Sequence, residues 1–104
     1  MTKIIVAQDA PVLVTIDIAK ARHEVLIAIP DKKRRRRLTV LNERADFNRL
    51  VTVLKEYEGP VRVAFEATCN YHRAMAYHLA TAGFELKLVS SAALARTREA
   101  LNNS

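Results

Sequence analysis

The stretch of residues 42–60 constrains the fold most, because it places one helix between two strand-like runs. Its apolar residues recur at the three- and four-residue spacing of an amphipathic helix: Phe47, Leu50, Val51 and Leu54. Asn42 is suited to cap this helix, and Gly59-Pro60 ends it. A strand that follows a helical crossover runs parallel to the strand before it. The sequence therefore predicts an α/β fold with a central parallel pair.

Five runs rich in Val, Ile and Leu predict the strands of this sheet. The runs 12–16, 23–29 and 38–41 are joined by turns and form an antiparallel meander. The run 61–66 follows the helix, and 84–89 follows a second helix that starts near Asn70 and ends at Gly83 in a left-handed cap. The alanine-rich tail 92–101 favours a third helix.

A mixed five-stranded sheet with helices on both faces accounts for this order of elements. The RNase H-like arrangement, with strand order 3-2-1-4-5, is the natural candidate. Periodicity alone does not select it from other α/β folds; two acidic residues, Asp17 and Glu66, do. A chain of 104 residues can build one small core. Residues 1–11 are expected to form a leader and residues 12–104 the domain. Six side chains are expected to be buried in its core: Phe47, Leu50, Leu54, Val63, Phe65 and Leu79.

Asp17 and Glu66 stand out among the 11 acidic residues, because each closes an apolar strand. The expected topology makes these two strands parallel neighbours, about 4.8 Å apart, with both carboxylates at their carboxyl ends. Two such charges repel unless a cation lies between them, and hard oxygen ligands favour Mg²⁺ or Mn²⁺. The alternative is that both acids only cap strands and accept backbone hydrogen bonds.

The residues around these acids form two recognisable motifs. Residues 14–20 read Val-Thr-Ile-Asp-Ile-Ala-Lys, and residues 65–71 read Phe-Glu-Ala-Thr-Cys-Asn-Tyr. The first resembles the opening motif of the DEDD insertion-sequence transposases, a group that includes the Piv-type DNA invertases and resembles the RuvC resolvase. The second resembles their Glu-Ala-Thr motif, although Cys69 and Asn70 stand where that family usually has glycines.

The resemblance implies that Asp17 and Glu66 are two of four acidic ligands for Mg²⁺ or Mn²⁺ in a metal-dependent, RuvC-like DNA-strand-processing domain that acts in transposition. The family's other two acids belong to a segment after the region where these 104 residues end. The chain is therefore expected to be truncated, with half a catalytic site and no activity by itself. The resemblance also implies that DNA is the partner, with a structured guide RNA as a further candidate. The full-length protein is expected to form a homo-oligomer and to act in a prokaryotic cytoplasm. The short apolar run 4–7 predicts no membrane span.

Six of the 17 basic residues form one block: Lys32, Lys33, Arg34, Arg35, Arg36 and Arg37. Without these six, 11 basic residues face 11 acidic ones, so the excess charge is local. The block is expected at the turn between the second and third strands, where it can bind nucleic-acid phosphates. Lys20, just after Asp17, is a further candidate for phosphate binding. The alternative for the block is a solvated hairpin tip that protects a sheet edge from aggregation.

The remaining notable side chains favour structural interpretations. No acidic residue stands at a spacing that would pair with His23, His72 or His78, so ordinary surface or core roles are expected for them. Tyr71 lies on the apolar face of the second helix and is expected in the core. The single cysteine, Cys69, is expected to be a small buried side chain that fills space.

Two rival functions fit parts of the sequence. A sugar-kinase or actin-like half also opens with a strand that ends in Asp, but it requires glycines directly after the acid, where Ile18, Ala19 and Lys20 stand. A non-catalytic nucleic-acid-binding or dimerisation module of RNase H-like fold stays open. Metal-dependent cleavage by a longer chain separates that module from a nuclease.

Overall fold

The computed structural model describes residues 10–30, 33, 35–66 and 70–89. The chain forms β1 (Val12–Asp17), β2 (Arg22–Ala28), β3 (Arg36–Leu41), α1 (Arg44–Leu54), β4 (Val61–Glu66), a short 3₁₀ helix (Asn70–His72), α2 (Arg73–Thr81) and β5 (Glu85–Val89). These elements follow the predicted order. Almost all of the predicted leader and the whole predicted tail helix lie outside the described residues.

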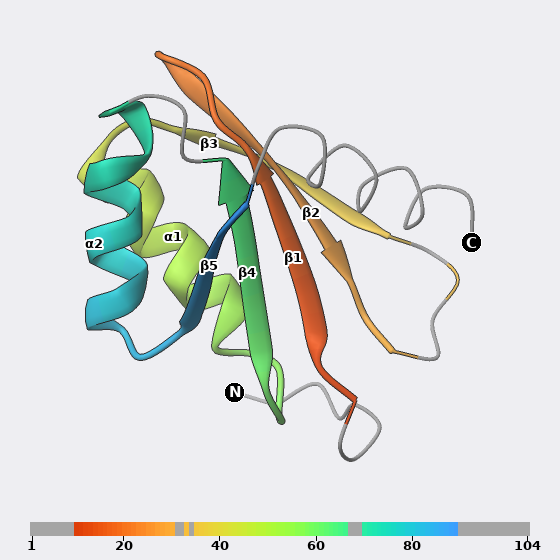
Figure 1. The fold of residues 1–104 in the computed structure, drawn as a ribbon. Helices are drawn as coiled ribbons and strands as arrows, with labels where there is room; N and C mark the ends of the chain where they lie inside the picture. The colour runs from red at the N-terminus through yellow and green to blue at the C-terminus, as the bar shows by residue number, and fades with distance from the viewer. Residues whose placement is uncertain (1–9, 31–32, 34, 67–69, 90–104) are drawn as a thin grey trace.

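The strands form one sheet in the order β3-β2-β1-β4-β5 (Figure 1). β1 pairs antiparallel with β2 and parallel with β4, and β4 pairs parallel with β5. Both α1 and α2 pack on the same face of this sheet (Figure 1). The predicted mixed α/β sheet of RNase H-like order is confirmed, whereas the helix expected on the other face falls among residues that the structure does not describe.

The core lies between this sheet and the two helices, and strand alternation explains its composition. Val14 and Ile16 of β1 and Val63 and Phe65 of β4 all point toward the helices and are buried. All six residues predicted for the core are buried: Phe47, Leu50, Leu54, Val63, Phe65 and Leu79. Neither described helix is long and apolar enough to cross a membrane.

Three local predictions are wrong. β3 begins at Arg36, two residues earlier than expected, so Arg36 and Arg37 pair with β2 rather than forming part of the turn. The N-cap of α1 is Glu43, which makes no side-chain cap bond, because the Asn42 amide binds the β1–β2 connection instead. Tyr71 is 42% exposed, since it lies in the 3₁₀ helix before α2 rather than on the buried stripe.

Gly83 follows α2 in the left-handed conformation that was predicted, with φ at +97°. Its N–H donates to the Ala80 carbonyl at 3.0 Å, and the Phe84 N–H donates to the Leu79 carbonyl at 3.2 Å. Together these bonds turn the chain from α2 into β5.

Replacing Gly83 with Ala is expected to destabilise the chain by about 1–2 kcal/mol, because an L-residue is strained at positive φ. Outside the two adjoining residues, no heavy atom lies within 4 Å of the added Cβ, so the cost is backbone strain and not a clash. Urea denaturation measures the free energy of unfolding, with exposed Thr81→Ala as the control. A Gly83→Ala chain as stable as the wild type would show that this cap is readily replaced.

Candidate functional site

Asp17 and Glu66 end the two parallel strands at the centre of the sheet. Ile16 of β1 pairs with Phe65 of β4, and the next residue in each strand is the acid. Their backbones are therefore neighbours at the carboxyl ends of both strands, which is the edge where open α/β sheets place their sites. The side chain of Asp17 is exposed. Of Glu66 only the backbone is described, which pairs with Val89 of β5.

The face on which Asp17 lies follows from the alternation of β1. Val14 and Ile16 point toward the helices, so Asp17 projects from the opposite face together with Thr15. Glu24 of β2 is the antiparallel partner of Asp17 and shares this face. Opposed residues in an antiparallel pair have Cβ atoms about 5 Å apart, so two like charges face each other here.

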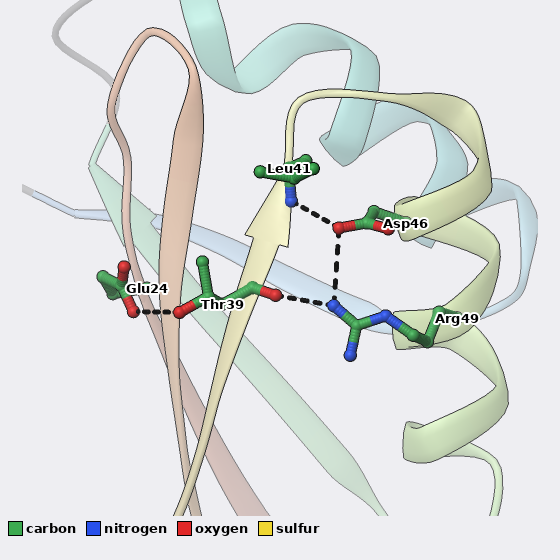
Figure 2. Close-up of polar contacts among 5 residues, drawn as sticks. All are labelled: Glu24, Thr39, Leu41, Asp46 and Arg49. Carbon is green, nitrogen blue, oxygen red and sulfur yellow. Dashed lines mark hydrogen bonds and ion pairs between the residues drawn. The ribbon is translucent and has the colours of Figure 1, made fainter.

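Glu24 was not singled out from the sequence, because its place opposite Asp17 depends on the exact register of β1 and β2. Its Oε2 accepts a hydrogen bond from the Thr39 hydroxyl at 2.9 Å. Figure 2 shows that Thr39 also connects β3 to α1, since its carbonyl accepts a bond from the Arg49 guanidinium at 2.6 Å. The carboxylate of Glu24 is thus held toward β3, on the side away from β4.

Asp46 completes this set of contacts at the start of α1 (Figure 2). Its Oδ2 accepts the Leu41 N–H at 2.7 Å and lies 3.4 Å from the Arg49 guanidinium. The bond from the Leu41 amide, together with the charge of Arg49, lowers the pKa of the Asp46 carboxyl. These contacts fix the end of β3 to the first turns of α1.

His23 lies at the same end of the sheet and is fully buried on the helix face. Its Nδ1 is 3.2 Å from the Ala19 backbone nitrogen, and its Nε2 is 3.4 Å from the Asn42 Oδ1. The predicted structural role of His23 is consistent with this burial.

The basic block does not lie beside the two acids. Lys33 and Arg37 are exposed, Arg35 and Arg36 are half-buried, and Lys32 and Arg34 fall outside the described residues. The block spans the β2–β3 connection, at the end of β2 opposite the Asp17 row. Arg36, the first residue of β3, lies three positions before Thr39, which shares the Asp17 row, and is therefore about 10 Å from that row along the strand.

Arg35 and Arg36 of the block each make a specific hydrogen bond. The Arg36 guanidinium donates to the Tyr57 hydroxyl at 3.3 Å on the helix face, and that of Arg35 donates to the Lys33 carbonyl at 3.0 Å. Arg36 and Arg37 point to opposite faces, because they are consecutive in a strand. Lys20, by contrast, is exposed in the connection that directly follows β1, close to the acids along the chain.

Carboxylate oxygens are the type of ligand that a hard divalent cation prefers, but few lie at this edge of the sheet. Within the described residues, no group of three or more His, Cys, Asp or Glu side chains is placed to hold a metal ion. The β1 and β4 ends supply two carboxylates, and His23 has both ring nitrogens engaged.

The comparison with protein families agrees with the two motifs and the strand order. Residues 14–104 match the transposase family DEDD_Tnp_IS110. The chain belongs to this family. Its function is therefore DNA transposition, with DNA as the partner, and transposases of this family depend on divalent metal ions. A search of curated proteins found no match.

Proposed function

We propose that this transposase domain processes DNA strands with Mg²⁺ or Mn²⁺, and that Asp17 and Glu66 are two of the acids that hold the metal. The observation that carries the proposal is the register of β1 and β4, in which the acids directly follow the Ile16–Phe65 pair. Two strand ends at about 4.8 Å spacing bring both carboxylates within reach of a shared cation.

The chemistry of the ligands supports this assignment. Carboxylate oxygens suit Mg²⁺ and Mn²⁺, and such ions activate water and stabilise the leaving oxygen in phosphodiester cleavage. Asp17 is exposed at the carboxyl end of β1, so a DNA strand can approach it there. We further propose that the two acids absent from these 104 residues complete the ligand set in a longer chain, and that the chain by itself is inactive.

The test is strand cleavage or joining by a transposase that contains this domain followed by the segment with the remaining acids. Activity is expected with Mg²⁺ or Mn²⁺ and should disappear with a chelator. The 104-residue chain is expected to bind either ion weakly and to cut no DNA, because two carboxylates cannot fix two ions for in-line attack. DNA binding by the longer chain without any cleavage would instead support the non-catalytic module.

We also propose that the basic block binds DNA phosphates, with Lys20 as a second contact nearer the metal. The structure favours Lys33 and Arg37 for this role, because both are exposed. The distance of the block from Asp17 suits a duplex that extends over several base pairs, at about 3.4 Å for each step along a strand.

Replacing Arg34 to Arg37 with Ser should weaken binding to unrelated DNA sequences by similar factors, because phosphate contacts carry no sequence information. The slope of log affinity against log salt should become shallower by about 0.9 for each phosphate that the protein no longer neutralises. Fluorescence anisotropy at several salt concentrations measures both, with Arg62→Ser as the control, since Arg62 lies on β4, which β2 and β1 separate from β3. An unchanged slope would show that the block is a solvated tip.

The same proposal extends to an RNA ligand and to the oligomeric state of the full-length protein. A structured guide RNA is a second candidate ligand for the basic block, and the full-length protein is expected to act as a homo-oligomer in a prokaryotic cytoplasm.

A further inference from the structure

The connection between β1 and β2, residues 18–21, is held by three hydrogen bonds from outside it. The Ala19 N–H donates to the His23 Nδ1 at 3.2 Å. The Asn42 Nδ2 donates to the Lys20 carbonyl at 3.2 Å, and the Asn42 backbone N–H donates to the Ala21 carbonyl at 3.0 Å. Three consecutive residues that begin two positions after Asp17 are therefore fixed in place.

The direction of these bonds determines which ring nitrogen of His23 carries the proton. A backbone N–H can only donate, so Nδ1 must accept and carries no proton. The proton is then on Nε2, from which it is donated to the Asn42 Oδ1 at 3.4 Å. A closed series of bonds results, from Ala19 through His23 and Asn42 back to the Lys20 carbonyl.

The neutral imidazole is the form that this arrangement requires. A second proton would lie on Nδ1 and face the Ala19 N–H, donor against donor. Burial lowers the pKa of His23, although the bond to Asn42 partly opposes this effect. With both nitrogens engaged and the ring fully buried, His23 is not available as a metal ligand or a proton carrier to DNA.

We propose that His23 and Asn42 are positioning residues for Asp17: together they fix the backbone that follows it, and so hold its carboxylate at the end of β1 for the metal ion. The inference rests on the proposed metal role of Asp17. Antiparallel pairing with Glu24 restrains one side of Asp17. Without the bonds to Ala19 and Lys20, the connection after it would lose two of its three anchors and keep the backbone bond from Asn42 to Ala21.

Two NMR measurements on the 104-residue chain test this proposal. Hydrogen exchange of the Ala19 amide reports whether the connection is held, and paramagnetic broadening by Mn²⁺ at the Asp17 and Ile18 amides reports weak metal binding. Asp17→Asn should abolish the broadening. His23→Leu should speed the exchange of Ala19 and raise the apparent Kd for Mn²⁺ about tenfold or more, as loss of a supporting hydrogen bond around a ligand does.

Conservative variants distinguish positioning from general stability. In His23→Asn the side-chain oxygen can replace Nδ1 as the acceptor for Ala19, so most of the Mn²⁺ affinity should return. His23→Gln, which reaches toward Asn42 instead, should restore less. Asn42 is exposed, so Asn42→Ala should fold and still weaken Mn²⁺ binding; it carries the test if His23→Leu does not fold.

The outcomes separate the two proposals. If the wild-type chain shows no Mn²⁺ effect at Asp17, the metal role of Asp17 fails, whereas the exchange of Ala19 still tests whether His23 holds the connection. If folded His23→Leu and Asn42→Ala bind Mn²⁺ as the wild type does, the positioning role is overturned.

Discussion

Asp17→Asn and Glu66→Gln are each expected to lower metal-dependent strand cleavage by about a hundredfold or more in a transposase that contains this domain and the remaining acids. Each change keeps the size of the side chain and most of its hydrogen-bonding capacity, but removes the negative charge that attracts the cation. Because the two acids directly follow the paired residues Ile16 and Phe65, either loss should disturb the same ion.

The matched control is Glu85→Gln, which removes a carboxylate from the opposite end of the sheet, where Glu85 pairs with exposed Arg62. Cleavage should be close to wild type in this variant. Thermal melting of all three variants shows whether folding is preserved. If either Asp17→Asn or Glu66→Gln keeps full activity, that residue is a structural strand cap and the proposed metal site is wrong at that position.

Leu54→Ala is expected to lower the free energy of unfolding by about 2–5 kcal/mol, the range for a large buried aliphatic side chain cut back to Ala. Leu54 is fully buried in the last turn of α1, within the cluster that joins this helix to the sheet. The change loses transfer free energy and leaves a cavity. A domain of this size has a total stability of about 5–15 kcal/mol, so the variant should lose a substantial part of it.

Chemical denaturation of Leu54→Ala and of Leu88→Ala provides the comparison. Leu88 is 55% exposed on β5, so its truncation should cost far less than that of Leu54. A change below about half a kcal/mol at Leu54 would show that the packing of α1 against the sheet contributes little to stability.

The strands and helices were largely predictable, because their apolar spacing is regular and the crossover rule leaves few arrangements. The errors occur where a contact distant in sequence decides the local structure. Arg36 and Arg37 look like turn residues by charge, yet pairing with Ile27 and Leu26 makes them part of β3. Asn42 has the character of an N-cap, but its amide binds the Lys20 carbonyl instead.

The candidate site was predictable in part. Asp17 and Glu66 stand out because each ends an apolar run, and parallel pairing then makes their backbones neighbours. Glu24 and His23 could not be recognised in the same way, because their relation to the Asp17 region depends on one exact register between β1 and β2. A shift of a single residue would turn Glu24 to the other face of the sheet.

β1 pairs with one strand that is close in sequence, β2, and one that is distant, β4. This difference in sequence separation affects the order of folding. It reaches β2 through a short connection, but its pairing with β4 joins residues as distant in sequence as Val12 and Val61. Closing that longer loop costs more chain entropy, so the meander is expected to form before β4 docks. Asp17 is therefore expected to be in place early, and Glu66 to join it only when the crossover is complete. A chain still emerging from the ribosome thus lacks the acidic pair until its central sheet has assembled.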